Sequence, residues 1–371
     1  MGNIDGNLDP NFETARIIKS YERPLIRNAW YCAAWSHEVT QELFTRRILD
    51  TPILLYRTQD GKAVALLDIC PHKLAPLHLG IKVGDSVQCG YHGLEFDCSG
   101  NCVRNPQGSQ EIPQVAKLRS FPLLEKWGVL WIWMGDPELA DETKIIDVSH
   151  FDDPAWRTVK GGHHVNSNYM LLVENLLDLG HALFLHKNSG GIDSNLVLTE
   201  ASIEQQDNRL QDLRLYRNAV PPRTIFGKYA PKGVPLDYNA DMLWVAPSMC
   251  MSHNGCSLSG RARDGSGLSL RGTHLITPET QHTMHYFYGT SRNYALDDPE
   301  IDEAYRRFQR EALHAEDSRV AEAIDAVLPE AMAHGVRMVM LSTDVSGLRV
   351  NRILDKMAAA EATGWPLRGQ S

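Results

Sequence analysis

The sequence has no hydrophobic run that could cross a membrane. Its 371 residues contain no stretch of the roughly 18 consecutive apolar residues that a membrane-spanning helix needs. The first residues, Met1 to Gly6, are polar and acidic, without the basic and then apolar layout of a secretory signal. These absences predict a cytoplasmic protein with no membrane partner.

The sequence also has no excess of positive charge, and its cysteines cannot all be paired in disulfides because their number is odd. Its formal net charge is −9, which argues against a nucleic-acid-binding protein. Seven cysteines, an odd number, fit a reducing compartment better than a disulfide framework. No Gly-rich dinucleotide fingerprint follows a strand pattern, so NADH and flavin are expected on separate proteins.

The composition that remains is that of an ordinary globular protein. With 43% hydrophobic and 22% charged residues, a chain of this length predicts two domains. A polar arm at 1–25 precedes short strands and turns, which predict an all-β domain over 26–150. A polar linker around 136–153 then leads into a second domain, 151–371, that mixes strand and helix patterns.

In the second domain, apolar residues at helical spacing predict three helices, and alternation predicts strands. The helices are expected at 169–185, 299–328 and 345–360, and the strands within 199–218 and 267–290. The fold class is therefore α+β.

Cysteine and histidine recur together in two short boxes of the predicted all-β domain. Cys70-Pro71-His72 is followed, after sixteen residues, by Cys89-Gly90-Tyr91-His92. Zinc fingers group the cysteines together and the histidines together, whereas here each box supplies one of each. Two thiolates on one iron and two imidazoles on the other are the ligands of a Rieske [2Fe–2S] cluster. The boxes predict such a cluster on Cys70, His72, Cys89 and His92, with structural zinc as the alternative.

A second group of polar residues interrupts the apolar helical pattern that begins at Tyr169. His181 and His186 are five residues apart, about 140° round an ideal α-helix, so a regular helix cannot aim both at one ion. We therefore expect the helix to end near Leu185 or to be locally distorted. Two histidines and one carboxylate with open positions form the facial triad of oxygen-activating Fe(II) enzymes.

The carboxylate of such a triad must come from another part of the chain. In the next predicted helix, Leu313, Val320 and Ile324 form an apolar stripe, and Asp317 falls within it. Glu316 lies one residue off the stripe. An acid inside an apolar stripe is the better ligand candidate, so Asp317 is favoured over Glu316, with an ordinary solvated acid as the alternative.

Several segments together carry a family resemblance that covers nearly the whole chain after its first 25 residues. They are Arg27–Tyr31, Asp68–Leu77, Tyr91–Asp97, Asn175–His186, Arg271–Thr280 and Glu316–Asp317. In these segments the chain resembles the Rieske non-haem iron aromatic oxygenases, in particular the dicamba and vanillate O-demethylase group. The resemblance implies a helix-grip, START-like catalytic domain with an antiparallel sheet, and an iron bound by His181, His186 and Asp317.

The resemblance also implies partners and an assembly. The family forms head-to-tail homotrimers in which the cluster of one subunit serves the iron of its neighbour, and Asp178 matches the acid between the two centres. Its carboxylate can hydrogen-bond the outer N–H of His92 and orient His181. Electrons are expected from NADH only indirectly, through a ferredoxin reductase and a ferredoxin.

The implied reaction uses O2 and two electrons to hydroxylate a small aromatic compound. On an O-methyl or N-alkyl group the hydroxylated carbon is unstable, so the compound loses an aldehyde and is dealkylated. Ring dihydroxylation, or methyl or ring hydroxylation, by the same centres is the alternative. A Rieske electron carrier without catalytic iron is a more remote one, because the second domain would have no purpose.

The resemblance is weakest where substrate contacts are expected. Candidate substrate residues are Asn175, His253, His274 and Phe308. The stretches 190–197 and 220–237 depart from the family pattern, so the resemblance implies the reaction class and not the substrate. No role is assigned to the remaining cysteines, Cys32, Cys98, Cys102, Cys250 and Cys256.

Overall fold

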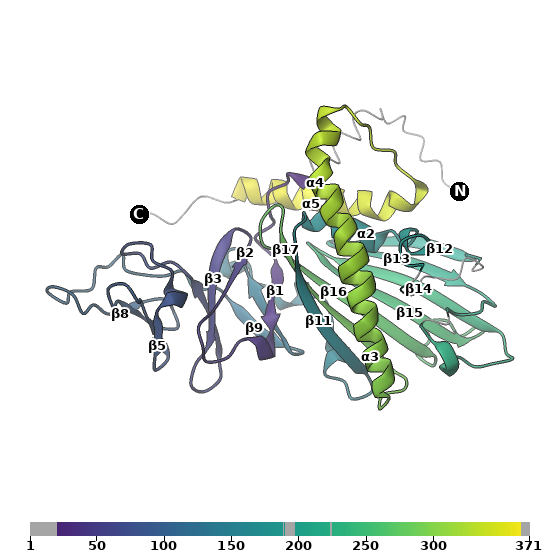
Figure 1. The fold of residues 1–371 in the computed structure, drawn as a ribbon, viewed down its shortest axis with the longest axis horizontal. Helices are drawn as coiled ribbons and strands as arrows, with labels where there is room; N and C mark the ends of the chain where they lie inside the picture. The colour runs from purple at the N-terminus through teal and green to yellow at the C-terminus, as the bar shows by residue number, and fades with distance from the viewer. Residues whose placement is uncertain (1–20, 188, 190–196, 223–224, 365–371) are drawn as a thin grey trace. The chain divides into compact units, whose positions relative to one another are not determined.

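The computed structural model describes residues 21–187, 189, 197–222 and 225–364 (Figure 1). Most of the polar arm, all but one residue of 190–197, and two residues of 220–237 therefore lie outside the described residues. The chain divides into two compact units. The smaller unit comprises Arg27–Asp152 and Thr277–Thr280, and the larger unit comprises the remainder.

The smaller unit consists of antiparallel strands in three small sheets, ordered β1-β10-β9, β2-β3-β4 and β5-β6-β7-β8. The strands are β1 (Trp30–Trp35), β2 (Phe44–Ile48), β3 (Thr51–Arg57), β4 (Ala63–Leu67), β5 (Ile81–Val83), β6 (Ser86–Gln88), β7 (Glu95–Phe96), β8 (Cys102–Arg104), β9 (Leu123–Lys126) and β10 (Val129–Trp133). The run of large apolar residues in β10 explains its central place, because every one of its side chains is buried. Gly61, with φ +89°, makes the turn between β3 and β4 that the sequence predicts.

The short segment Thr277–Thr280, which is more than 120 residues C-terminal to the rest of the smaller unit, also belongs to that unit. The amide of Leu49 donates to the carbonyl of Pro278 at 3.0 Å, and Thr277 Oγ1 donates to the carbonyl of Cys32 at 2.8 Å. The proposed limits 26–150 and 151–371 place this segment in the second domain. The compact units place it with the first.

The larger unit is built on one seven-stranded antiparallel sheet, ordered β11-β17-β16-β15-β14-β13-β12. The strands are β11 (Arg157–Val165), β12 (Glu200–Gln206), β13 (Arg209–Tyr216), β14 (Leu236–Val245), β15 (Met249–Leu258), β16 (Leu268–Pro278) and β17 (Met284–Arg292). The sequence did not predict β11, β14 and β15. In β14 the polar residues Asp237, Asn239 and Asp241 alternate with apolar ones over 236–242, so a strand pattern was present in the sequence and was missed.

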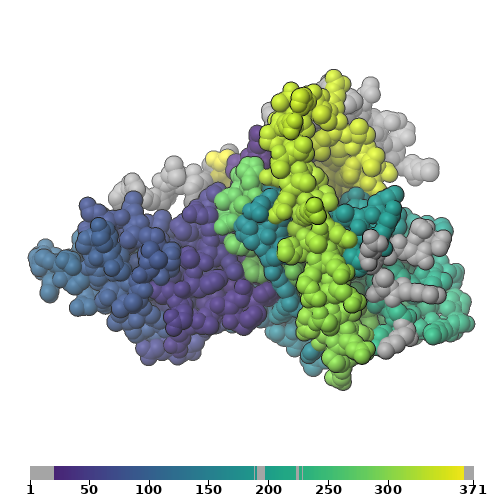
Figure 2. All heavy atoms as spheres, in the orientation of Figure 1, coloured from purple at the N-terminus to yellow at the C-terminus, as the bar shows by residue number. Residues whose placement is uncertain are grey.

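The helices of this unit are α2 (Tyr169–Leu177), α3 (Pro299–Phe308), η8 (Gln309–Ser318), α4 (Arg319–Ala333) and α5 (Val345–Gly364). Four of them, α2, α3, η8 and α5, contact the sheet, and α4 packs on η8 and α2. The segments α3, η8 and α4 run on as one long helix across the strands, and their atoms form a continuous yellow-green ridge in Figure 2. Gln309 donates to the carbonyl of Val159 in β11, and Ser346 donates to Asp212 in β13. The α+β prediction, with an all-β first part and helices on an antiparallel sheet, is confirmed.

Two helix predictions need correction. The first helix does not run to Leu185: α2 ends at Leu177, where Asp178 leaves helical geometry, and a 3-10 turn, η6 (His181–Leu183), follows. The long helix runs to Ala333, beyond the predicted residue 328, and contains the π-helical segment η8. A π turn depends on contacts with other elements, so an apolar period does not predict it.

Further 3-10 turns connect these elements: η1 (Ser36–Glu38), η2 (Leu77–Leu79), η3 (Pro137–Leu139), η4 (Glu142–Lys144), η5 (Ser149–Phe151), η7 (Gly227–Tyr229) and η9 (Ser342–Asp344). Among the helices of the described residues, none has the length and apolar character needed to cross a membrane.

Candidate metal centres

The two Cys/His boxes lie on loops with the same backbone hydrogen bonds. In the first loop the amide of Cys70 donates to Ala75 and the amide of Leu74 donates to Cys70, at 2.9 and 3.0 Å. In the second, Cys89 donates to Leu94 and Gly93 donates to Cys89, at 2.8 and 3.0 Å. Leu74 and Gly93, at matching positions, both have positive φ. The two boxes thus present their cysteines from equivalent turns.

These turns bury the sulfur ligands and leave the imidazoles near the surface. Cys70 and Cys89 are 1% and 2% exposed, whereas His72 is exposed and His92 half-buried. The two imidazole rings lie with their centroids 4.4 Å apart. Burial raises the pKa of Cys70 to about 11, with the Cys89 thiol beside it, so a thiolate pair here needs a compensating cation. This arrangement of donors fits a Rieske cluster, with sulfur ligands inside and imidazoles outside.

Glycines allow the two loops to approach each other closely. A side chain on Gly80 would overlap the carbonyl oxygen of Gln88, and a Cβ on Gly90 would lie 2.7 Å from the carbonyl oxygen of Leu79. The loop that follows the first box, which includes η2, therefore packs directly on the second box.

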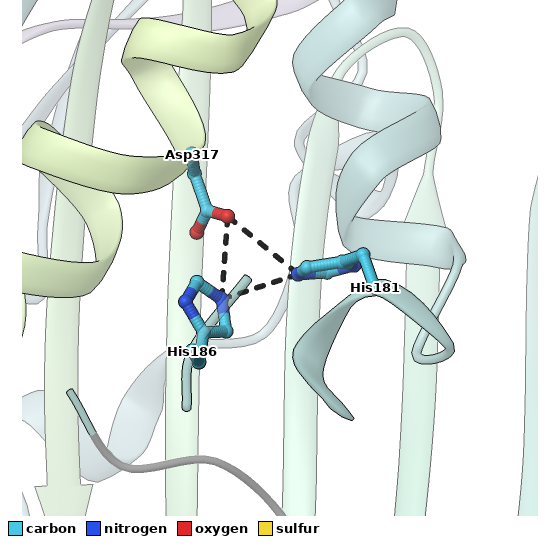
Figure 3. Close-up of side chains that lie close together, drawn as sticks. All are labelled: His181, His186 and Asp317. Carbon is cyan, nitrogen blue, oxygen red and sulfur yellow. Dashed lines mark hydrogen bonds and ion pairs between the residues drawn. The ribbon is translucent and has the colours of Figure 1, made fainter. Parts of the chain in front are cut away.

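His181, His186 and Asp317 converge in the larger unit (Figure 3). Their candidate ligand atoms all lie within 4.8 Å of one another. The Nε2 atoms of the histidines are 3.2 Å apart, and Asp317 Oδ1 lies 3.5 Å from Nε2 of His181 and 3.3 Å from Nε2 of His186. Two imidazoles and one buried carboxylate facing a common point fit a single cation with open positions, as the facial triad requires.

The early end of α2 makes this convergence possible. Since the helix stops at Leu177, His181 and His186 belong to a 3-10 turn and the turn after it, where the 140° separation of an α-helix does not apply. The Nδ1 atom of His181 contacts the backbone carbonyl of Asp178. The role expected of the Asp178 side chain toward His181 is thus filled by its backbone, while its carboxylate accepts the amide of Gly180 at 2.8 Å.

Glu316, which lies off the predicted apolar stripe, contacts the second histidine, His186. Its Oε2 lies 2.7 Å from Nδ1 of His186 and accepts the hydroxyl of Ser189 at 2.5 Å. Burial would lower the pKa of His186, but hydrogen bonds and charge from Asp317 and Glu316 outweigh burial and raise it. No apolar period in the sequence could have identified Glu316, because its partner lies 130 residues away.

The predicted apolar stripe along this helix was only partly correct. Asp317 and Leu313 are buried, as predicted, but Val320 and Ile324 are exposed. The π segment η8 ends at Ser318, after Asp317 and before Val320. The change back to α-helical geometry rotates the side of the helix that faces the core, so that Ala321 is buried instead of Val320.

The four candidate substrate residues are not gathered at one place. Asn175 lies beside the triad: its Nδ2 donates to Asp317 Oδ1 at 3.4 Å, and its buried Oδ1 has no hydrogen-bond partner. His274 is buried, with Nδ1 2.6 Å from the hydroxyl of Tyr286, and burial lowers its pKa to about 4. Phe308 ends α3 and is half-buried.

His253 lies on the opposite face of the sheet from His274. In the ladder of β15 and β16, Cys250 pairs with His274, and His253 pairs with Arg271. Directly paired residues share a face and neighbours in a strand alternate, so His253 and Arg271 face away from the helices. There His253 contacts Ser269 at 2.8 Å. This geometry argues against His253 as a substrate residue.

The remaining cysteines are free thiols. Cys98 and Cys102 pack against the core that surrounds Cys70 and Cys89, while Cys32, Cys250 and Cys256 are buried elsewhere.

Comparison with known proteins covers both units. Residues 29–122 match the Rieske [2Fe–2S] domain, and residues 165–360 match the vanillate O-demethylase oxygenase C-terminal domain. The chain is 43% identical over 337 residues to the dicamba O-demethylase oxygenase component of Stenotrophomonas maltophilia, a match that spans 91% of this chain and 99% of the relative.

Two further proteins are similar over the same length. The chloroacetanilide N-alkylformylase oxygenase component of Rhizorhabdus wittichii is 35% identical, over 91% of this chain and 96% of that protein. The crystal structure of dicamba monooxygenase with non-haem iron and dicamba superposes with a TM-score of 0.81 at 41% identity, over 92% of this chain and all of that chain, 100%.

Proposed function

Because this chain belongs to the Rieske non-haem iron oxygenases with a vanillate O-demethylase-type C-terminal domain, we propose that it dealkylates a small aromatic ether or N-alkyl compound. It is the oxygenase component of a multicomponent system, with a Rieske cluster and a mononuclear iron. The observation that carries the proposal is the convergence of His181, His186 and Asp317 in a chain that also presents the paired Cys/His boxes.

The proposed ligands follow from the donor sets. Cys70, Cys89, His72 and His92 would hold the cluster, and His181, His186 and Asp317 the mononuclear iron. When bound, these groups supply single electrons and activate O2 for insertion of one oxygen atom into a substrate C–H bond.

The protein contributes the orientation of the ligands. The backbone carbonyl of Asp178 fixes the ring of His181, and the carboxylate of Glu316 fixes that of His186. Since each contact is made at Nδ1, both histidines direct Nε2 toward the ion. Asn175, beside Asp317 and with an unsatisfied oxygen, is a candidate to bind substrate or water at an open position.

His274 is proposed as a hydrogen-bond donor to the substrate. Burial lowers its pKa to about 4, so the ring is neutral near pH 7. The contact with the Tyr286 hydroxyl is made at Nδ1, and we propose the tautomer in which that hydroxyl donates to Nδ1 and the ring proton lies on Nε2. A neutral imidazole with Nε2–H can donate to an ether or carboxylate oxygen of an aromatic substrate. Phe308 is proposed only as a wall of the pocket.

A ferredoxin and its reductase are the electron-supplying partners implied for such an oxygenase component. The apolar side chains of Leu74, Leu79, Tyr91 and Val115 near the cluster boxes are 72%, 70%, 65% and 85% exposed. Such a surface supports a protein docking there. We propose that it serves a second copy of this chain, in a head-to-tail homotrimer in which His92 of one subunit meets Asp178 of its neighbour.

The proposal is tested by a screen of aromatic ethers and N-alkyl anilides with a surrogate ferredoxin and reductase. The expected result is O2 uptake coupled to release of formaldehyde or a larger aldehyde. A cis-diol or a ring-hydroxylated product without aldehyde would overturn dealkylation while keeping the oxygenase. Anaerobic metal analysis that finds the two cluster irons and no third would overturn the oxygenase itself.

A further inference from the structure

The long helix over the sheet changes its hydrogen-bonding pattern where it carries the metal-site acids. Between α3 and α4 the segment η8 (Gln309–Ser318) is a π-helix. A π turn joins residues i and i+5, so neighbours are separated by a smaller angle than in an α-helix, which joins i and i+4. Glu316 and Asp317, adjacent in sequence, can therefore both face the histidines, one toward Nδ1 and the other toward Nε2 of His186.

The first residue of the π segment is tied to the sheet. The side-chain amide of Gln309, which is 3% exposed, donates to the carbonyl of Val159 at 2.9 Å and to Thr290 Oγ1 at 3.0 Å. Gly161 lies beside it in β11. A side chain there would collide with the ring of Tyr288 and lie 3.2 Å from Oε1 of Gln309.

The last residue of the π segment is tied to the same strand. The buried hydroxyl of Ser318 donates to the carbonyl of Leu313, five residues earlier, at 2.7 Å. Its proton is thus used, so its oxygen accepts the Nε2–H of His163 in β11 at 2.8 Å. The bond from Ser318 to Leu313 spans the i to i+5 interval of the π turn that ends beside Asp317, and the bond from His163 ties that turn to β11.

The imidazole of His163 is itself held in place. Its ring stacks on His314, with centroids 4.2 Å apart and an interplanar angle of 28°, and its Nδ1 lies 3.4 Å from the hydroxyl of Tyr288. Burial, with the charge of His314 as a smaller cause, lowers the pKa of His163 to about 4. The ring is therefore neutral, with a single N–H directed at Ser318.

We propose that Gln309, Ser318 and His163 are positioning residues that hold the π-helical register of η8 and thereby place Glu316 and Asp317 against His186 and His181. The proposal rests on the proposed function, since it takes these residues as the mononuclear iron site. It extends that function by assigning residues of β11 and η8, outside the ligand set, to the geometry of the site.

The test uses purified holoprotein and measures Fe(II) affinity of the mononuclear site by anaerobic competition with a chelator. A second readout is the visible spectrum of Co(II) bound at that site. Ser318→Ala and His163→Phe are expected to lower Fe(II) affinity up to about 10-fold, the lower end of the range for losing a direct outer partner of a metal ligand, and to alter the Co(II) bands. The cluster absorption should stay unchanged.

Conservative variants and a matched control separate positioning from simple destabilisation. His163→Gln keeps an N–H donor and Ser318→Thr keeps the hydroxyl, so both should retain most of the wild-type affinity. His164→Phe changes the next residue of β11, which is exposed on the opposite face, and should bind Fe(II) like the wild type.

The outcomes distinguish this proposal from the one it rests on. Wild-type affinity and Co(II) bands in both Ser318→Ala and His163→Phe would overturn the positioning role alone. Iron retained in His181→Ala, or no mononuclear iron in the wild type, would overturn the ligand assignment. If His163→Phe fails to fold, as a lost thermal unfolding transition of the larger unit would reveal, the smaller change Ser318→Ala decides the question.

Discussion

The imidazole of His186 is contacted at both nitrogens. Nε2 faces Asp317 and His181, while Nδ1 faces the carboxylate of Glu316. A carboxylate behind a metal-binding imidazole fixes its tautomer and raises its basicity, so it contributes to metal affinity without touching the metal. At the scale of single residues, the site therefore depends on a second acid as well as on its proposed ligands.

Replacing Glu316 tests this dependence. Glu316→Gln keeps the shape of the side chain but removes its charge, and we expect the affinity for mononuclear iron to fall about 10-fold. Iron per chain after dialysis against a chelator measures the effect, with cluster iron counted separately by its visible absorption. Glu311→Gln, an exposed acid of the same π segment, is the control. Equal iron retention in the two variants would contradict the role of Glu316.

The buried ring of His274 predicts a pH dependence of stability. Its pKa falls from 6.5 to about 4 in the folded protein because of burial. Between these values the unfolded chain binds a proton that the folded chain does not, so stability is lost as pH falls from about 6.5 toward 4, by at most about 3 kcal/mol. His274→Gln should weaken this dependence. The midpoint of thermal unfolding is measured at pH 5 and at pH 7.5 for both proteins. If the two midpoints differ as much in the variant as in the wild type, the prediction is contradicted.

At the scale of elements, the two cluster loops are mutually supporting. Each contains the same pair of backbone hydrogen bonds around its cysteine, and glycines let the loops touch. The ligand geometry therefore belongs to the pair of loops. By the same reasoning the triad depends on where α2 ends and where the long helix turns to π geometry, because those features aim the side chains.

Gly80→Ala tests the contact between the cluster loops. The added methyl group would overlap the carbonyl oxygen of Gln88, part of the backbone, so one loop must move. We expect loss of most cluster content, measured by visible absorption and by iron and sulfide analysis. Gly347→Ala is the control, since its Cβ would meet only Glu174 Cγ, at 3.4 Å. Full cluster content in Gly80→Ala would show that the loops tolerate separation.

At the scale of the whole molecule, the proposed trimer predicts complementation between defective subunits. Cys89→Ser should lose the cluster and His181→Ala the mononuclear iron, so each alone should be inactive. Co-expressed, the two should form mixed trimers in which an intact cluster faces an intact iron site, and activity should return. Aldehyde release measures the activity, and light scattering measures the mass of the assembly.

Co-expression of Cys89→Ser with Cys70→Ser, which both lack the cluster, is the matched control and should remain inactive. If mixed trimers form but the first pair also stays inactive, electrons pass within one chain and the head-to-tail route is wrong.

The sequence by itself determined the chemistry of this protein. The Cys/His boxes are local, each within four residues, so the donor types for a Rieske cluster can be read directly. His181 and His186 are also local and lie in an apolar setting, where polar side chains need a partner or a metal. These features, with the family resemblance they carry, predicted the fold class, the cofactors and membership of the Rieske oxygenases, all of which are confirmed.

Only the tertiary structure decided how the sites are held. Glu316 meets His186 across 130 residues, and His163 meets Ser318 across 155 residues, so no local pattern contains either contact. The same is true of His253, because the pairing of β15 with β16 decides which face of the sheet it occupies. Periodicity describes one element at a time, whereas the end of α2 and the π register of η8 depend on the elements that pack against them.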